Sequence, residues 1–247
     1  VIFALMPALL FGLFNAGYQH YKALGLLVDG DLISQFLTLD NALFGAWRLV
    51  PMILVTYAAG LGVEMVFAFK NKHAVAEGFL VSGILIPLIM PLDMPLWMIA
   101  VSTIFAVLIA KEVFGGTGMN ILNIALTARA FAFFAYPSVM SGDKAWVNTT
   151  TEAGQSVVDG YSGATALGEM AATGSSSYSA WDAFIGMIPG SIGETSVVMI
   201  LLGAVLLIVT RIASWKIMLS AVMGALLMGW IFNGLASYMI SPEQQVY

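Results

Sequence analysis

The segment from Asp159 to Thr165 displays a hydroxyl group among small residues, in the order DGYSGAT. The residue types alone favour a glycine-containing turn, with Thr165 as the N-cap of a short helix that runs through Ala172. The alternative is that the Thr165 hydroxyl is presented to a modifying enzyme, which needs small neighbours because it must enclose the peptide backbone. Either way, the residues concerned are Asp159, Gly160, Ser162, Gly163, Ala164 and Thr165.

A second glycine-rich stretch, GGTGMN, begins at Gly115 and Gly116 and precedes an apolar run. Backbone N–H groups in such a loop can bind an anion at the start of a helix. The stretch lacks the Lys-Ser/Thr pair of a nucleotide-binding P-loop. The residue types favour a tight turn beside closely packed helices.

The composition places these segments in a membrane protein. Of 247 residues, 60% are hydrophobic and 9% are charged, and the mean hydropathy is +0.93. Soluble domains carry roughly 25% charged residues, so a water-facing surface cannot be built here. The chain has no cysteine, which excludes an iron–sulfur cluster held by this chain alone. His20 and His73 are expected in separate loops, which argues against paired haem ligands, and the net charge of −5 argues against nucleic acid.

Apolar runs predict an all-α, polytopic transmembrane bundle with about seven spans in one integral membrane domain, residues 1–247. Pro87, Pro91 and Pro95 interrupt two of the runs, so some helices should be short or broken, as in a transporter-like or channel-like core. Because the chain opens inside an apolar run and stops soon after the last one, we expect a fragment of a longer protein. The expected spans are 1–17, 44–69, 78–92, 95–110, 120–137, 195–210 and 216–239.

Basic residues predict the orientation of the bundle. If the first span runs outward, five fall in cytoplasmic loops: Lys70, Lys72, Lys111, Arg211 and Lys216. Three then lie outside: Lys22, Arg48 and Lys144. The polar segment 138–191, which contains Thr165, becomes an extracytoplasmic loop.

Matched segments along nearly the whole chain carry a family resemblance. They are EGF (77–79), MPLWMIAV (94–101), KEVFGGTGMNILN (111–123), RAFAFFAYPSVMSGD (129–143), DGYSGATAL (159–167), WDAFIGMIPGSIGE (181–194) and RIASWK (211–216). In these segments the chain resembles the NqrB family of sodium-translocating NADH:quinone oxidoreductases, which is related to the RnfD proteins of Rnf complexes.

The resemblance implies a urea-transporter-like fold and a place in a multi-subunit complex of the bacterial inner membrane. It implies FMN joined through its phosphate to Thr165, and riboflavin held at or near the protein. Electrons would pass from a partner protein of the complex towards a quinone, coupled to sodium transport. The flavin transferase of this family works outside the cytoplasm, in agreement with the orientation that the basic residues predict.

The resemblance also bears on other candidates. It weakly implies that Gly115 and Gly116 lie at a quinone site, although Met119 and Ile124 depart from the usual family pattern. Ionisable residues inside a membrane are functional candidates by default. Arg129 could neutralise a flavin phosphate or form a structural ion pair, and neither is favoured. Glu64 could line a cation path, but a structural pairing is favoured.

Two rival functions stay open on the residues alone. One is a channel or secondary transporter without a redox role, to which broken helices and the intramembrane Glu64 and Arg129 would point equally well. The other is an inert scaffold or assembly protein. A covalent flavin would distinguish the redox protein from both rivals, because it would stay on the polypeptide after denaturation and could still be detected by its fluorescence.

Overall fold

The computed structural model of the chain describes residues 1–27, 31–72, 78–116, 118–142, 145–149 and 163–239. Within these ranges the secondary structure is helical, which confirms the predicted all-α class. Asp159, Gly160 and Ser162 lie outside the described residues, as does His73.

Each predicted span coincides with an apolar helix in the described residues. The long ones are α1 (Ile2–Ala23), α3 (Leu39–Asn71), α5 (Leu96–Ala110) and α11 (Trp215–Met239). Within the described residues, helical stretches at these four places are long and apolar enough to cross a membrane. The shorter apolar helices are α4 (Phe79–Leu88), α6 (Ile124–Ala135) and α10 (Val197–Val209). The chain is therefore a multi-pass membrane protein with several short helices, as the prolines indicated.

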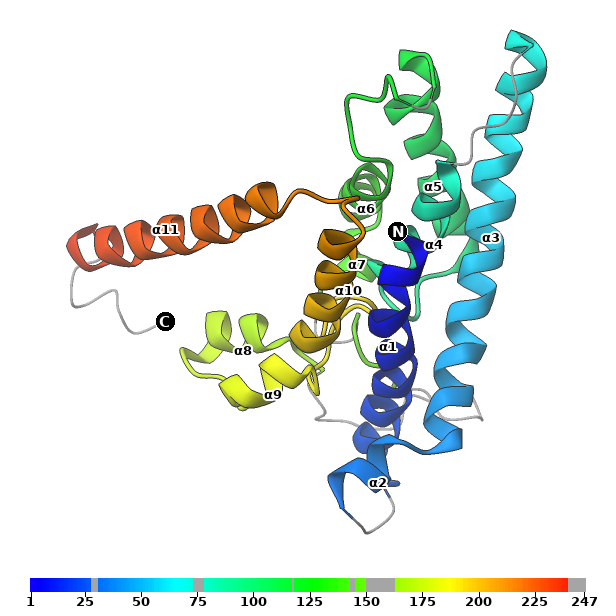
Figure 1. The fold of residues 1–247 in the computed structure, drawn as a ribbon. Helices are drawn as coiled ribbons and strands as arrows, with labels where there is room; N and C mark the ends of the chain where they lie inside the picture. Colours follow the sequence, from blue (N-terminus) through cyan, green and yellow to red (C-terminus); the bar gives the residue numbers. More distant parts are fainter. Residues whose placement is uncertain (28–30, 73–77, 117, 143–144, 150–162, 240–247) are drawn as a thin grey trace.

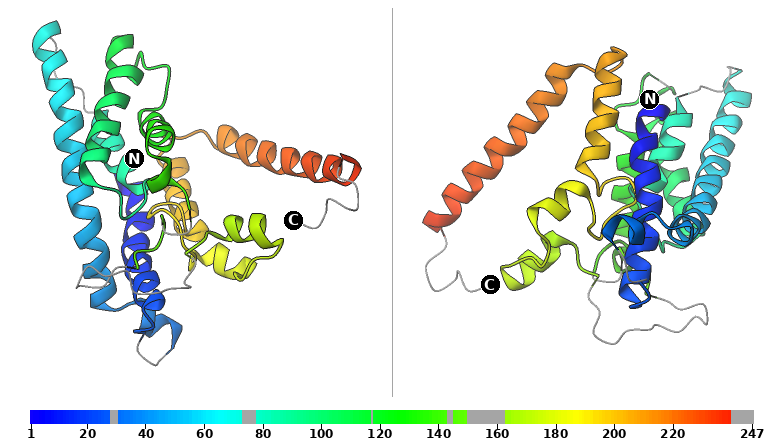
Figure 2. Two further views of the ribbon diagram at one scale, coloured as in Figure 1. Left: turned by 180° about the vertical axis from the view of Figure 1, so that it is seen from behind. Right: turned by 60° about the horizontal axis from the view of Figure 1, so that its bottom comes forward.

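Short helices connect or flank these seven. They are α2 (Leu32–Phe36), the 3₁₀ turn η1 (Glu112–Phe114), α7 (Pro137–Met140), α8 (Ala166–Thr173) and α9 (Ala180–Ile185). Helices α8 and α9 lie beside the lower end of α10, whereas α11 projects away from the other helices (Figures 1 and 2).

Helix α1 is longer than predicted, and the expectation that His20 lies in a loop is wrong. The last turns of α1 are polar, which ended the predicted span at residue 17, yet Gln19 and His20 are buried in the protein. His20 Nδ1 lies 2.7 Å from the carbonyl oxygen of Asn148, and its ring stacks on Phe44 with centroids 4.0 Å apart. Polar residues can extend a helix beyond its apolar run where protein supplies their partners.

Glycines allow α1 to pack closely against α3 and α10. A Cβ at Gly45 would lie 2.2 Å from the carbonyl oxygen of Leu13, and one at Gly17 would lie 2.3 Å from the Cα of Asn41. On the other side of α1, Gly203 approaches the carbonyl oxygen of Ala4 in the same way. Small residues at interfaces between membrane helices permit this approach of two backbones.

The connection between α4 and α5 is irregular and yet lies in the core. Helix α4 has 10 residues, so it is about 15 Å long and covers half of a hydrocarbon layer of about 30 Å. The chain then turns through residues 89–95, where Met90, Leu92 and Met94 are buried. The predicted span 78–92 is thus a half-length helix, and its last residues form a buried turn.

A second irregular segment, residues 186–196, meets the first. The backbone N–H of Gly193 donates a 2.8 Å hydrogen bond to the carbonyl oxygen of Leu88, the last residue of α4. The segment also touches α1, since a Cβ at Gly12 would lie 2.0 Å from the carbonyl oxygen of Ile192. Non-helical backbone is tolerated at membrane depth where protein covers it, and here each segment helps to cover the other.

We predict that Gly45→Leu disrupts the contact between α1 and α3, because a side chain cannot fit against the Leu13 backbone. Gly62 lies on the same helix, and a Cβ added there would have nothing within 4 Å, so Gly62→Leu is the matched control. Fluorescence-detected size-exclusion chromatography of detergent extracts should show most of the monodisperse protein lost in the first variant and retained in the second. Equal yields of both variants would contradict this packing.

Candidate functional site

Thr165 is the N-cap of α8. Its backbone is extended (φ −68°, ψ 157°), and its Oγ1 accepts a 3.2 Å hydrogen bond from the backbone N–H of Gly168. The helix ends at Gly174, which takes the left-handed conformation (φ 74°) that favours glycine. The N-cap interpretation of Thr165 is confirmed, with α8 running one residue beyond the predicted Ala172, whereas most of the predicted turn before it lies outside the described residues.

The surroundings of the Thr165 hydroxyl are small. Gly163 and Ala164 are buried, and Thr165 itself is half-buried. A Cβ at Gly168 would lie 3.4 Å from Thr165 Oγ1, in ordinary contact distance. The hydroxyl therefore stands at the open end of an eight-residue helix, among residues that leave room around it.

Glu169, the acidic residue of α8, forms its hydrogen bonds with Ser177. The backbone N–H and the hydroxyl of Ser177 donate to the carboxylate of Glu169, and these bonds hold the pKa of that carboxyl below its usual value. The neighbouring helix α9 begins with a capping box, in which Ser179 and Asp182 exchange hydrogen bonds. The bonds of Glu169 turn its negative charge towards the loop that follows α8.

Apolar side chains are exposed on α8 and α9. Leu167, Met170, Trp181 and Phe184 all belong to this group, and the rings of Trp181 and Phe184 stack with centroids 5.9 Å apart. Aromatic residues of this kind are typical of a membrane interface or a protein contact. The helix that begins at Thr165 thus has a surface suited to either environment.

Arg129 lies at the middle of α6, as predicted, and the structure gives it a carboxylate partner. Its Nη1 lies 2.7 Å from Oε2 of Glu194, and its guanidinium lies 5.8 Å from the centre of the Trp146 ring. The Arg129 and Glu194 side chains are 31% and 48% exposed. Glu194 lies just beyond the segment 138–191 that holds Thr165, whereas Trp146 lies within it.

Glu64 forms an ion pair with Lys111 inside the protein. Both side chains are no more than 3% exposed, and Nζ of Lys111 contacts Oε1 of Glu64. Lys111 directly follows the last residue of α5, and its side chain folds back onto α3. The pair places the end of α5 beside the last turns of α3 and is a structural pairing of the kind favoured for Glu64.

The Gly115–Gly116 turn follows this pair directly. Both glycines have left-handed backbone conformations (φ 108° and 94°), and the carbonyl oxygen of Lys111 accepts from the N–H of Gly116 at 3.0 Å. Helix α6 then begins at Ile124 with Asn123 as its cap. The turn is tight, as predicted. Exposed apolar side chains surround it: Val113, Phe114, Met119, Ile121 and Leu122.

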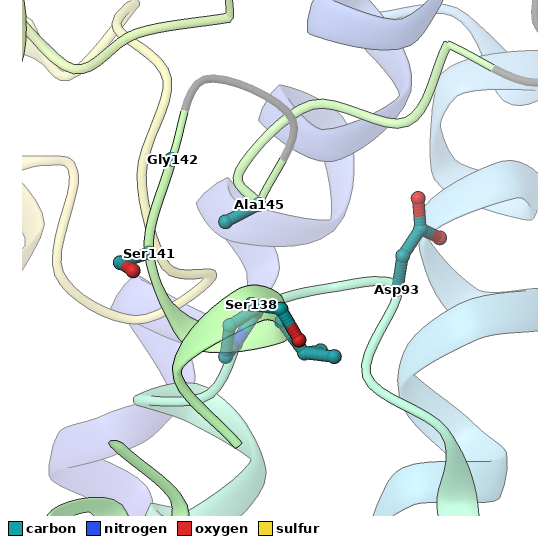
Figure 3. A pocket seen from close by; sticks show the side chains of 7 residues that line it. Asp93, Ser138, Ser141, Gly142 and Ala145 are labelled. Atoms are coloured by element: carbon teal, nitrogen blue, oxygen red, sulfur yellow. The ribbon is translucent and has the colours of Figure 1, made fainter. Parts of the chain in front are cut away.

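Asp93 was missed by the sequence analysis. It lies in the α4–α5 turn, 3.2 Å from Nη1 of Arg48, and both of its oxygens accept from the Asn148 amide at 2.7 and 2.6 Å. Asp93 also lines a cavity of about 400 Å³ with Ser138, Ser141, Gly142 and Ala145 (Figure 3). A lone carboxylate between Pro91 and Pro95 was the signal that could have found it.

Comparison with known proteins decides the family. The sequence model of the NQR2, RnfD, RnfE family matches residues 1–246. The chain belongs to this family. The predicted resemblance is confirmed.

Its relatives include three proteins named as the B subunit of Na(+)-translocating NADH-quinone reductase. The one from Chromohalobacter salexigens is 45% identical, over 94% of this chain and 58% of the relative. Those from Yersinia pestis and Neisseria meningitidis serogroup B are 39% and 40% identical, over 96% and 95% of this chain and 62% and 61% of the relatives. The chain thus spans about three fifths of the length of these relatives.

We predict that Lys111→Met destabilises the protein strongly, because it leaves the buried Glu64 carboxylate without this cation. Breaking a buried pair from one side typically costs about 3–5 kcal/mol. The double variant Glu64→Leu/Lys111→Met should recover most of that loss. The measurement is the thermal unfolding of detergent-solubilised protein.

Arg129→Met is the control for the Lys111 variant, because both side chains of the Arg129–Glu194 pair are partly exposed, so its loss should cost less than that of the buried pair. If Lys111→Met is no more harmful than Arg129→Met, or if the double variant is no more stable than Lys111→Met alone, the buried pair does not have this role.

Proposed function

We propose that the chain is the flavin-carrying membrane subunit of a bacterial sodium-translocating NADH:quinone reductase, with FMN joined through its phosphate to Thr165. The observation that carries the proposal is the position of the Thr165 hydroxyl in a DGxSGAT segment, at the N-cap of α8. Membership of the NQR2, RnfD, RnfE family and the names of the relatives support it.

The start of α8 suits a phosphate ester. An ester of Thr165 would carry a negative charge beside the first N–H groups of the helix, and helix N-termini stabilise anions. The Glu169 carboxylate, which would repel that charge, accepts from Ser177 instead. Gly163, Ala164 and Gly168 leave space for the group. The flavin would supply redox chemistry, and the protein would determine its position and electrostatic surroundings.

The remaining roles follow from the same proposal. Electrons would come from a partner protein of a multi-subunit complex in the bacterial inner membrane and pass towards a quinone, with sodium as the transported ion. A second flavin, riboflavin, would be held at or near the chain. Arg129 as a flavin ligand, Glu64 in an ion path and Gly115–Gly116 at a quinone site stay predictions. The exposed apolar side chains around the glycine turn favour a hydrophobic neighbour there.

A channel or secondary transporter is the second candidate. The two irregular segments, 89–95 and 186–196, meet inside the bundle, and broken helices of this kind surround the substrate sites of many transporters. An inert scaffold protein would not require broken helices. A covalent flavin separates the redox protein from both rivals.

We predict that Thr165→Ala abolishes covalent flavin while the folded chain stays in the membrane. The protein is produced with the complex and its flavin transferase, denatured and examined for in-gel fluorescence under ultraviolet light; mass spectrometry then locates the FMN increment. Thr165→Ser, which keeps a hydroxyl, should retain part of the modification. The assignment is wrong if the wild-type protein carries the FMN increment on another residue or carries no increment at all.

Loss of a helix cap is the confounding effect in that experiment, since Thr→Ala at an N-cap costs about 1 kcal/mol. Ser179→Ala removes the equivalent cap of the adjacent helix α9, so it serves as the matched control. It should retain full fluorescence. If both variants lose flavin equally, local stability rather than the Thr165 hydroxyl controls the modification.

We also predict that the loop containing α8 faces outward and that the end of α3 faces the cytoplasm. The chain has no cysteine, so single cysteines at Ser175 and Lys72, both exposed, report on each side. A membrane-impermeant maleimide added to spheroplasts should label Ser175→Cys and leave Lys72→Cys unlabelled until the membrane is opened. The reverse pattern contradicts the orientation and, with it, modification by an external transferase.

A further inference from the structure

Two amide side chains lie buried one turn apart on α1. Asn15 and Gln19 are 4% and 3% exposed. The Asn15 amide donates to the carbonyl oxygen of Ile188 at 3.1 Å, and the Gln19 amide donates to Asn15 Oδ1 at 3.3 Å. Each bond uses one N–H of the donating amide, and Oε1 of Gln19 is buried with no partner in the described part of the chain. A carbonyl oxygen buried without a partner inside a membrane protein is unfavourable, so an occupant is expected beside it.

A cavity of about 10 Å³ lies beside these amides. It is lined by α1, the α4–α5 turn, the loop at Trp146 and the irregular segment 186–196. This volume accommodates one species of the size of a water molecule. Its lining residues are Gly12, Asn15, Ala16, Gln19, Leu92, Trp146, Gly190 and Ile192.

The lining, among the described residues, offers neutral oxygen atoms and no charged side chain. Gly190 and Ile192 belong to a non-helical stretch, so the backbone there does not follow the hydrogen-bonding pattern of a helix, and Gly12 allows the Ile192 carbonyl to approach α1 closely. Carbonyl oxygens of unwound backbone coordinate Na⁺ in membrane transporters. Divalent ions such as Ca²⁺ take carboxylates, which this lining lacks.

A cation outside the lining, Arg129, has its guanidinium 5.8 Å from the centre of the Trp146 ring. Trp146 lines the cavity, and Glu194 neutralises Arg129. The ion pair with Glu194 therefore limits the repulsion that a cation bound in the cavity would experience from Arg129.

We propose that this cavity is a binding site for a single Na⁺ ion, with Gln19 Oε1 as a ligand and with Asn15 Oδ1 and backbone carbonyls of 190–192 as the further oxygens. The proposal rests on the proposed function, in which sodium is the transported ion. An amide oxygen accepts but does not donate, so it suits a cation directly. The neutral ligand set holds a monovalent ion without trapping it.

The test is the Na⁺ dependence of quinone reduction by the complete complex in proteoliposomes, with ²²Na⁺ uptake measured in parallel. Gln19→Leu should raise the half-saturating Na⁺ concentration at least tenfold, while the KM for quinone at saturating Na⁺ and the covalent flavin content stay unchanged. The control is Thr103→Val, which removes another buried oxygen that lacks a partner among the described residues, on α5 and outside the cavity lining; its Na⁺ curve should match the wild type.

Gln19→Glu keeps the length of the side chain and tests the same atom if Gln19→Leu does not assemble. Its carboxylate should lower the half-saturating Na⁺ concentration. If Na⁺ curves of the assembled variants coincide with the wild type, or fall uniformly without a shift, the cavity holds a water molecule and the proposal is wrong. A wild-type complex whose quinone reduction ignores Na⁺ would instead overturn the proposed function.

Discussion

The hydrogen bond between Gly193 and Leu88 marks the constraint on which this architecture depends. A chain in a hydrocarbon layer must satisfy every backbone N–H and C=O within the protein, yet two segments here leave the helical path. They can do so because they meet: the end of α4 supplies a carbonyl to the segment before α10. The close approaches at Gly12 and Gly193 then follow, since a side chain at either position would separate α1 or α4 from residues 186–196.

The same constraint acts on charged side chains. Glu64, Asp93 and Arg129 each lie in or between apolar helices, and each has an oppositely charged partner from a distant part of the chain. These pairs connect α3 to the end of α5, α3 to the α4–α5 turn, and α6 to the segment before α10. Each charge is tolerated because tertiary contacts supply its partner, so these residues also join the elements that surround the irregular core.

Sequence reasoning located the seven apolar helices of the described residues because hydropathy and proline are local signals. It also found the Thr165 cap, which depends on four consecutive residues. It failed where the deciding partner is remote. Lys111 pairs with a residue 47 positions away, and His20 meets a carbonyl 128 positions away, so neither pattern could show that the side chain is buried. Gln19 was overlooked for the same reason: a polar residue near the end of an apolar run resembles a loop until the fold encloses it.

The two interpretations of Thr165 do not exclude each other, because both use the same local physics. An N-cap places its oxygen at the end of a helix where N–H groups lack carbonyl partners, and the backbone amides and helix dipole there also stabilise a phosphate. The cap alone therefore cannot argue against modification. What separates a capping threonine from a flavin-carrying one is the space around the hydroxyl and the direction of nearby negative charge. At α8 the neighbours are small, and the Glu169 carboxylate is bonded to Ser177. A bulky residue at 163 or 164, or a free carboxylate beside the cap, would preserve the helix and oppose the ester.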